Sequence, residues 1–336
     1  MLCHNGLMSQ IRVLGESETD NAVSLLLAGG LLGLPTETVY GLAAKAMDEK
    51  SVRRIYEVKG RPLDHPVIVH IGTFEELDVW GDEISDEARI LAEKFWPGPL
   101  TLVVKRKPIA GDWLTGGQET VALRMPSHPV ALKILQALGT GVAAPSANKF
   151  GSVSPTSAQH VIADLSAVLD ATRDAIIDGG SSEVGLESTI VNCTVSHPVV
   201  LRPGAITQNQ IDEVLNSKVE FAAKADIKAP GLLASHYAPN ARVVLANSEP
   251  ELLALMEKIP SDKFVGLIAL EKIGTPNGCI RLAMPHSNMD YAQVMYEAMR
   301  AGDLQNLQTI VVVLPAGDDI AIAIRDRLTK AAHQPN

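Results

Sequence analysis

The chain has few cysteines and few aromatic residues. Its three cysteines, Cys3, Cys193 and Cys279, are far apart and form no Cys-x-x-Cys pair. This spacing argues against a disulfide framework and a structural zinc site, and it fits a reducing, cytoplasmic environment. Because aromatic residues make up only 4% of the sequence, stacking surfaces for single-stranded nucleic acid would have to be few.

Positive charge is also scarce. The formal net charge of −10 argues against a broad, non-specific nucleic-acid surface, because the neutralisation of phosphates requires clustered Lys and Arg. A local basic cleft remains compatible with this total, since the electric field depends more on the arrangement of charges than on their sum.

Long apolar runs and the common nucleotide-binding loops are missing as well. No apolar run approaches the roughly 18 residues of a membrane-spanning helix, and the first residues lack the basic and apolar regions of a signal peptide. Met8 is an alternative start, which would make the first seven residues a weakly structured leader. Gly116-Gly117 and Gly179-Gly180 lack the strand–helix setting of a dinucleotide-binding or Walker loop.

Length and composition predict a globular α/β chain of two domains. The 336 residues are 46% hydrophobic and 20% charged, which is ample for more than one core. We expect a catalytic domain over 8–215, a linker over 216–241 rich in Lys, Ala, Pro and Gly, and a C-terminal domain over 242–336. The linker carries a His236-Tyr237-Ala238-Pro239 sequence, and a linker has little packing reason to carry a histidine and a tyrosine.

The two domains differ in their predicted order of helices and strands. In the first, we predict helices over 18–29, 48–58, 85–95, 129–138, 156–165 and 211–215. Predicted strands cover 31–34, 67–71, 100–104, 121–124, 142–144, 175–178, 188–193 and 199–201. Several of these strands follow one another directly, so the sheet is predicted to be mixed. In the second domain, the sequence pattern predicts strands that alternate regularly with helices. The strands cover 243–245, 265–270 and 309–314, and the helices cover 249–258, 291–300 and 320–332. This alternation indicates a small parallel sheet.

Two short stretches of the first domain have the residue types of a phosphate site. Lys59-Gly60-Arg61-Pro62 places two cations in a turn after a predicted helix, and Pro145-Ser146-Ala147-Asn148 follows a short predicted strand. Arg offers a planar fork, Lys a compact charge, and Ser and Asn small hydrogen-bonding groups. Each stretch alone is also compatible with a solvated helix end or an ordinary turn.

Other polar residues recur at the ends of predicted strands. Hydroxyl side chains occur at Thr36 and Thr38, in a predicted turn, and at Ser152, Ser154, Ser188 and Thr189. We expect these residues to line a crevice beyond the carboxyl ends of the strands, where open α/β sheets bind ligands.

Three charged residues and one histidine extend this prediction. Arg124 and Arg202 each end a predicted strand, where they would form either surface ion pairs or a pair of forks for a carboxylate or polyphosphate. Glu187 could hold a metal, orient an arginine or form a structural ion pair. His70 ends an apolar strand, a position typical of a satisfied core histidine.

In order along nearly the whole chain, many short motifs resemble the L-threonylcarbamoyl-adenylate synthases of the YrdC family, in the long form with a C-terminal extension. The motifs are PTETVYGL (35–42), KGRP (59–62), PVIVHI (66–71), WPGPLTLV (96–103), TVALRMP (120–126), AAPSAN (143–148), SPTSA (154–158), IIDGG (176–180), ESTIV (187–191), LRPG (201–204) and HYAP (236–239). The resemblance implies a twisted mixed sheet with an open cleft, and a smaller Rossmann-like parallel α/β domain behind the linker. Because the labile mixed anhydride that these enzymes make needs shielding from water, we hypothesise that the linker, at 229–239, acts as a lid over the active site.

The resemblance also implies roles for individual residues. Lys59, Arg61, Ser146 and Asn148 match the family's signature cluster for nucleotide and phosphates, which makes them the expected catalytic residues. Thr120, Ser154, Arg202 and Tyr237 match further nucleotide contacts, whereas Thr38, His70, Arg124, Ala144 and Ser188 match the L-threonine site. The family commonly has Asn where this chain has His65, a substitution that keeps a hydrogen-bonding side chain near the nucleotide.

The implied reaction joins L-threonine, bicarbonate and ATP into threonylcarbamoyl-adenylate and releases pyrophosphate, with Mg²⁺ entering on the ATP phosphates. The product would pass to separate proteins that modify tRNA. Two alternatives stay open: a YrdC-like RNA-binding module without adenylate-forming activity, and another carbamoyl-transfer enzyme of the kind found in hydrogenase maturation. The net charge of −10 counts against the first, and the three scattered cysteines count against the second.

Overall fold

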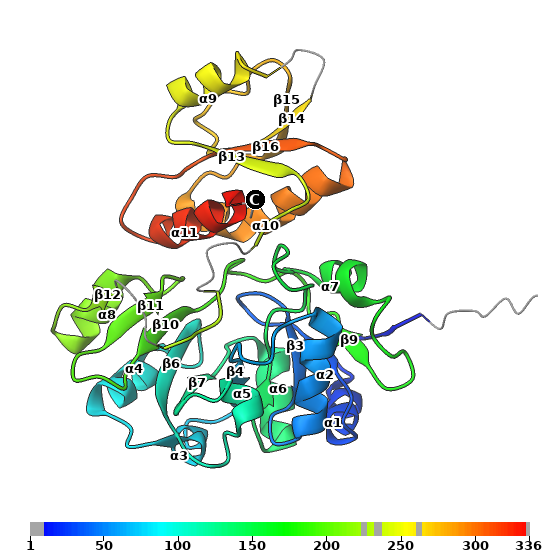
Figure 1. Cartoon of the computed structure of the whole chain (residues 1–336), viewed down its shortest axis with the longest axis vertical. Helices are drawn as coiled ribbons and strands as arrows, with labels where there is room; N and C mark the ends of the chain where they lie inside the picture. The colour runs from blue at the N-terminus through cyan, green and yellow to red at the C-terminus, as the bar shows by residue number, and fades with distance from the viewer. Residues whose placement is uncertain (1–9, 223–226, 232–236, 260–263, 334–336) are drawn as a thin grey trace, which may run out of the picture.

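The computed structural model describes residues 10–222, 227–231, 237–259 and 264–333. It consists of a larger part and a smaller part stacked against it (Figure 1). Each part is built on its own sheet. The two expected sheets, one mixed and one parallel, are both confirmed.

The larger part is built on a sheet of 12 strands. These are β1 (Arg12–Leu14), β2 (Leu32–Leu34), β3 (Gly41–Lys45), β4 (Ile68–His70), β5 (Gly81–Asp82), β6 (Leu100–Arg106), β7 (Thr120–Arg124), β8 (Val142–Ala143), β9 (Ala175–Ile177), β10 (Thr189–Asn192), β11 (Val199–Arg202) and β12 (Glu220–Phe221). Their order across the sheet is β1-β9-β2-β3-β8-β4-β7-β6-β10-β11-β12, with β5 paired to β6. Pairs β4–β7 and β6–β10 are parallel, whereas β6–β7 and β10–β11 are antiparallel.

Eight helices of the described chain belong to this part. They are α1 (Thr19–Leu27), α2 (Glu49–Lys59), α3 (Glu76–Trp80), α4 (Asp86–Phe95), α5 (Asp112–Thr115), α6 (Pro129–Leu138), α7 (Ala158–Leu165) and α8 (Gln208–Leu215). The ends of α2 show how local sequence positions the first motif. Asp48 caps its N-terminus by accepting from the Lys50 amide, and Gly60 ends it in a left-handed conformation at φ 64°. Gly60 thereby turns the chain so that Lys59 and Arg61 stand at the end of the helix.

Side chains alternate between the two faces of the central strands. Val69 and Leu123 point into the largest hydrophobic core, whereas Ile68 and Ala122 belong to a small cluster on the opposite face. His70 shares the face of Ile68, two residues away. The smaller cluster therefore lies on the same face of the sheet as His70, where the polar residues gather.

The smaller part has a parallel sheet of four strands in the order β13-β16-β14-β15. The strands are β13 (Arg242–Ala246), β14 (Val265–Ile268), β15 (Cys279–Ala283) and β16 (Thr309–Val313), and the helices are α9 (Glu249–Met256), α10 (Asn288–Leu304) and α11 (Ala321–Ala332). The predicted regular alternation is wrong at one place, because β14 is followed by β15 with no helix between them. Every residue of β15 is half-buried, and Arg281 interrupts its apolar residues, whereas β14 and β16 carry no charged residue.

The predicted linker over 216–241 is partly integrated into the larger part. Glu220 and Phe221 form β12, which pairs in parallel with β11. Lys228 bonds to Asp64 and Gln118. His236 lies outside the described residues, as do Cys3 and the proposed start at Met8.

Two further sequence predictions can be compared with the described chain. Cys193 and Cys279 are free thiols. No helix of the described ranges is both long and apolar enough to cross a bilayer.

Candidate functional site

A pocket of the larger part gathers most of the predicted site residues. Thr38, Arg61, His70, Arg124, Ala144, Ser146, Ser188, Arg202 and Tyr237 all line it. Lys59, His65, Thr120, Asn148 and Ser154 do not contribute to its lining. Its cavity volume is about 50 Å³, small beside the roughly 300–1,000 Å³ of ordinary ligand pockets. Pro230, Gly231 and Tyr237 contribute to this narrow enclosure.

The sequence predicts a pocket beyond the carboxyl ends of the strands, but the pocket lies where both strand ends and a strand start meet. His70 and Arg124 are in register at the ends of the parallel strands β4 and β7. Ser188, in contrast, stands just before the start of β10, and Arg202 ends the antiparallel strand β11. Because the sheet is mixed, strand starts and strand ends meet at the same place.

Arg124 is a buried cation of the pocket that is held by an ion pair and two hydrogen bonds. Its Nη1 donates to Thr38 Oγ1 at 2.8 Å, and its Nε donates to the Gly98 carbonyl at 3.3 Å. Its Nη2 lies 2.7 Å from Glu37 Oε1, and both side chains are about 5% exposed or less. Thr38 is held in turn by Thr36, whose hydroxyl lies 2.9 Å away. Glu37 and Thr36 thus fix a guanidinium group at the pocket wall.

Ser188 and Arg202 form a second polar group on the same wall. The Arg202 guanidinium donates to the Ser188 carbonyl through Nε (3.1 Å) and Nη2 (2.8 Å), and to the Ser188 hydroxyl through Nη2 (3.1 Å). The Ser188 hydroxyl also lies 2.7 Å from Thr101 Oγ1. Arg202 Nη1 donates to the Pro230 carbonyl at 3.0 Å, so the described linker is tied to this wall.

The two stretches that suggested a phosphate site lie against each other. Lys59 Nζ donates to the carbonyl groups of Ser146 and Asn148, at 2.5 Å each. Burial and the nearby Arg61 charge lower the pKa of Lys59 well below its ordinary value. The Asn148 amide donates to the Ser152 carbonyl at 2.7 Å and closes the next loop. Lys59 therefore orders the backbone of the serine–asparagine stretch from outside the pocket lining.

Arg61 stands beside this loop with its guanidinium in the pocket. Its Nη2 donates to the Pro66 carbonyl at 2.8 Å, and its charge lies 5.5 Å from the centre of the Phe150 ring. His65 contacts the edge of the same ring, with 5.5 Å between ring centres. Burial and the Arg61 charge lower the pKa of His65. Phe150, which the sequence did not single out, is thus the platform for both residues.

His70 is neither exposed nor remote from the pocket. Burial and the Arg124 charge lower its pKa to about 3, so the imidazole is neutral near pH 7. The sequence predicts a satisfied core histidine at this position, and the side chain is indeed buried, but its Nδ1 has no hydrogen-bond partner among the described residues. The structure adds that its ring lines the pocket.

Two predicted nucleotide residues have other surroundings. Thr120 is the first residue of β7, and Arg124 is the last, which separates them by about 13 Å at about 3.3 Å per residue. Ser154 is fully buried and donates to Glu187 Oε1 at 2.6 Å. Their assignments to the nucleotide stay predictions.

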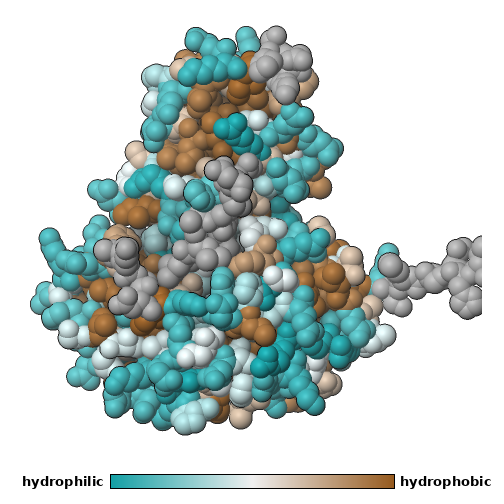
Figure 2. Space-filling view, in the orientation of Figure 1, coloured by the Kyte–Doolittle hydropathy of each residue, from teal (hydrophilic) through white to brown (hydrophobic). Residues whose placement is uncertain are grey.

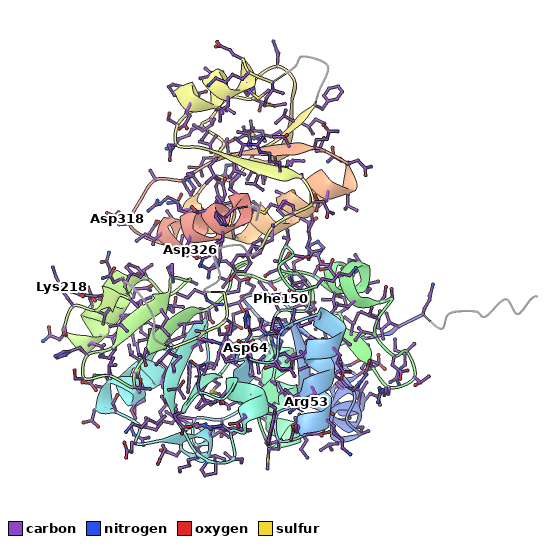
Figure 3. All side chains as sticks on the ribbon, in the orientation of Figure 1. Arg53, Asp64, Phe150, Lys218, Asp318 and Asp326 are labelled. Carbon is purple, nitrogen blue, oxygen red and sulfur yellow. The ribbon has the colours of Figure 1, made fainter. Side chains whose placement is uncertain are left out.

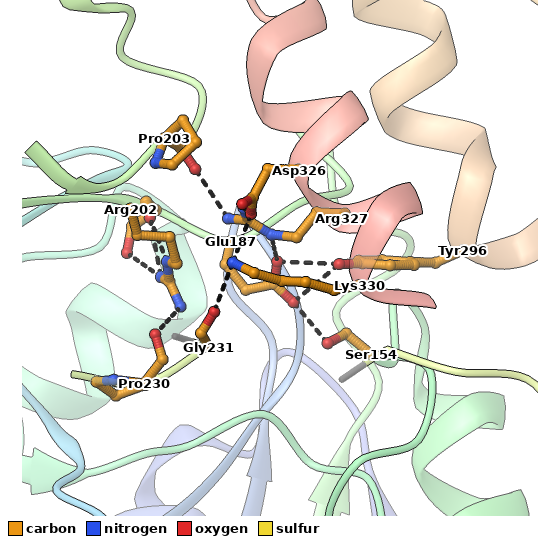
Figure 4. Close-up of polar contacts among 11 residues, drawn as sticks. Ser154, Glu187, Arg202, Pro203, Pro230, Gly231, Tyr296, Asp326, Arg327 and Lys330 are labelled. Atoms are coloured by element: carbon orange, nitrogen blue, oxygen red, sulfur yellow. Dashed lines mark hydrogen bonds and ion pairs between the residues drawn. The ribbon is translucent and has the colours of Figure 1, made fainter. Parts of the chain in front are cut away.

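A buried polar cluster joins the pocket to the smaller part (Figure 4). Glu187 accepts from Ser154, from Tyr296 of α10 at 3.0 Å, and from Arg327 Nε of α11 at 2.8 Å. Burial alone would raise the pKa of Glu187, but the charges of Arg327 and Arg202 outweigh it and lower the pKa to about 2. Of the roles considered for Glu187, the structure supports the ion pair.

Sequence reasoning missed Tyr296 and Arg327. A signal for Arg327 was present, because it lies three residues after Ile324 and four before Ala331, on the buried face of α11. A charged side chain on the apolar stripe of a helix calls for a buried partner. The partner could not be identified from periodicity, since it lies 140 residues away.

The stick and space-filling views place this junction in the whole molecule. Figure 3 shows Phe150 and Asp326 on opposite sides of the boundary between the two parts. Hydrophilic residues cover much of the larger part on the face seen in Figure 2. Among the described residues, no group of three or more His, Cys, Asp or Glu side chains is arranged to hold a metal ion.

Two family models together match most of the chain. The model described as "Telomere recombination" matches residues 24–204, and the model described as "Threonylcarbamoyl-AMP synthase, C-terminal domain" matches residues 206–333.

Full-length relatives share the same arrangement. The chain is 38% identical over 324 residues to a threonylcarbamoyl-AMP synthase of Pyrococcus abyssi, with 93% of each chain covered. It is 38% identical over 330 residues to the enzyme of the same name from Bacillus subtilis, covering 94% of this chain and 93% of the relative. The crystal structure of P. abyssi Sua5 complexed with L-threonine superposes with a TM-score of 0.86 at 37% identity, covering 96% of this chain and 97% of that one.

Proposed function

Because the chain belongs to the family of Sua5-type threonylcarbamoyl-AMP synthases, we propose that the pocket around Arg124 and Ser188 binds L-threonine. The observation that carries this proposal is the buried guanidinium of Arg124, held between Thr38 and Glu37 at the pocket wall. A planar fork is suited to a carboxylate. The L-threonine bound in the related P. abyssi protein supports an amino-acid site in this fold.

The remaining wall residues would orient the rest of the amino acid. The hydroxyl groups of Thr38 and Ser188 can accept or donate hydrogen bonds, and the Ala144 backbone borders the same space. His70 is neutral at pH 7 because its pKa is lowered to about 3. A neutral imidazole would leave the amine of threonine without a competing positive neighbour on that side.

We assign the nucleotide to the side of the pocket formed by Arg61 and Ser146. The enclosed volume of about 50 Å³ suits a small molecule, so ATP would extend beyond it. Arg61 and Arg202 both reach the pocket, and their charges would stabilise the phosphates. Lys59 and Asn148 would act by holding the loop that carries Ser146. The family resemblance implies that His65, Thr120, Ser154 and Tyr237 would make further contacts to ATP.

The proposed chemistry needs no covalent intermediate with the protein. The threonine amine adds to bicarbonate and water is lost, which gives a carbamate. A carbamate oxygen then attacks the α-phosphorus of ATP, and the bond to pyrophosphate breaks. Catalysis would come from positioning, which can contribute roughly 7–11 kcal/mol at best, and from cations beside the departing pyrophosphate.

Magnesium would be held by the phosphates rather than by the protein. The carboxylate that lines the pocket, Glu187, is already engaged by Arg327. The other polar side chains of the lining are arginines, hydroxyl groups and the neutral imidazole of His70. A phosphate-bound Mg²⁺ would neutralise part of the pyrophosphate charge. The threonylcarbamoyl-AMP product would pass to proteins that transfer its acyl group to tRNA, so contact of this chain with tRNA would be indirect.

Pyrophosphate release from ATP tests this proposal directly. We expect release to require both L-threonine and bicarbonate, and to fall by about 100-fold or more in Arg61→Ala, since removing one charge-stabilising donor typically has such an effect. Arg53→Ala is the matched control, because Arg53 is an exposed cation of α2, the helix that precedes Arg61. Release that ignores threonine, or equal activity of the two variants, would refute the assignment. RNA retention without any release would instead favour a binding module.

A further inference from the structure

Arg327 of the smaller part bonds to the sequence neighbours of Ser188 and Arg202, the two hydrogen-bonded residues of the pocket wall. Its Nε donates to Glu187 at 2.8 Å, and its Nη2 donates to the Pro203 carbonyl at 2.9 Å. Glu187 immediately precedes Ser188, and Pro203 immediately follows Arg202. One guanidinium group therefore fixes the residues next to two members of the pocket wall.

The surroundings of Arg327 allow little freedom. Its side chain is 0% exposed, and its charge lies 5.4 Å from the centre of the Tyr237 ring, which stacks on Tyr296. Tyr296 also donates to Glu187. The Asp326 carboxylate lies 2.5 Å from Arg327 Nη1. The arginine is thus held on several sides by residues of both parts.

We propose that Arg327 is a positioning residue of the synthase, through which the docked C-terminal domain fixes the geometry of Ser188 and Arg202. This inference rests on the proposed function, in which Ser188 contacts L-threonine. Arg327 touches no substrate in this account. It acts through the Glu187 carboxylate and the Pro203 carbonyl, so that the pocket has its binding geometry only when α11 is docked.

The planar fork is the feature that a lysine cannot replace. An ammonium group could satisfy the charge of Glu187, but it could not also hold the Pro203 carbonyl in the same direction. Arg327→Lys should therefore keep the smaller part docked on the larger part, while Ser188 and Arg202 at the pocket wall become less firmly positioned. Hydrogen bonds that involve a charged group are strong, and the loss of one can lower the affinity for a ligand by about tenfold.

The test is L-threonine affinity of the full-length protein, measured by calorimetry, together with the KM for threonine and the thermal midpoint. We expect Arg327→Lys to lower the affinity for L-threonine about tenfold. Arg325→Lys is the matched control, because Arg325 also holds two carbonyl groups (Pro315 and Gly317) but only within the smaller part. Tyr296→Phe removes a single hydroxyl group that donates to Glu187. We expect this variant to lower the affinity for L-threonine about threefold.

The outcomes separate this inference from the proposed function. Unchanged affinity in Arg327→Lys, or an equal loss in Arg325→Lys, would overturn the positioning role. If Arg327→Lys fails to fold, the result for Tyr296→Phe decides, and unchanged affinity there would overturn it. Ser188→Ala tests the underlying assignment of Ser188 to L-threonine. If Ser188→Ala weakens threonine binding but Arg327→Lys leaves it unchanged, the positioning role of Arg327 alone is refuted. If Ser188→Ala leaves threonine binding unchanged, the proposed contact between Ser188 and threonine is refuted.

Discussion

Arg124 and Glu37 form a buried ion pair at the wall of the pocket, with 2.7 Å between Nη2 and Oε1. Thr38, the residue next to Glu37, accepts from the same guanidinium. A buried charge that loses its partner is costly, because it remains desolvated without compensation. The pair therefore holds Arg124 ready for a second anion without leaving it uncompensated in the free protein.

Glu37→Gln should destabilise the protein and make its stability more dependent on L-threonine. We expect a loss of about 3 kcal/mol in the free energy of unfolding, since one partner of a buried pair is removed. A bound threonine carboxylate would replace the missing charge, so the ligand should raise the thermal midpoint more in the variant than in the original chain. Glu57→Gln, at an exposed position of α2, is the control. An equal response of both variants to threonine would contradict this prediction.

Lys59→Met should reduce both activity and stability. The ammonium group donates to the carbonyl groups of Ser146 and Asn148, and methionine would leave both groups without this donor. We expect a loss of about 1–3 kcal/mol in unfolding free energy and about a 100-fold lower kcat for pyrophosphate release. Lys50→Met changes an exposed lysine of the same helix and should affect neither. The prediction fails if Lys59→Met retains kcat within about threefold.

The pH dependence of stability should contain a contribution from His70. Its pKa falls from an ordinary 6.5 to about 3 in the folded protein, through burial and the Arg124 charge. The unfolded chain therefore binds a proton below pH 6.5 that the folded chain does not, and stability falls as the pH is lowered from about 6.5 toward 3. The contribution approaches about 1.4 kcal/mol per pH unit within that window.

His70→Gln should remove this slope, and equilibrium unfolding in denaturant at pH 4.5 and 7 would measure it. The comparison variant is His197→Gln, which changes an exposed histidine between β10 and β11 and should keep the original slope. If the two variants show the same dependence on pH, His70 is not the buried neutral group that the structure describes.

Gly231→Ala should weaken the closure of the pocket. Gly231 has φ +78°, and an added Cβ would lie 2.3 Å from the Tyr237 hydroxyl oxygen. We expect a stability loss larger than the roughly 1 kcal/mol cost of the left-handed conformation alone, with a raised KM for ATP and threonine. Gly139→Ala has a similar φ of +67° and open space around the Cβ, so it reports the conformational cost by itself. Equal losses in the two variants would show that the contact with Tyr237 is unimportant.

Much of the fold was predictable because it depends on neighbours in the chain. The Asp48 cap and the Gly60 end bound α2, and the apolar runs of the central strands mark their positions. Strands without a strong local pattern were missed. β3 begins within a stretch expected to be a turn, and β15 is half-buried throughout.

The sequence by itself determined the composition of the candidate site, since its motifs carry the cations and hydroxyl groups that bind carboxylates and phosphates. Only the tertiary structure decided which of these groups face the pocket. Antiparallel pairing of β10 with β11 brings Arg202 to Ser188, and docking of α11 brings Arg327 to Glu187, 140 residues away. Such contacts depend on strand register and on the packing of two domains, which no local periodicity encodes.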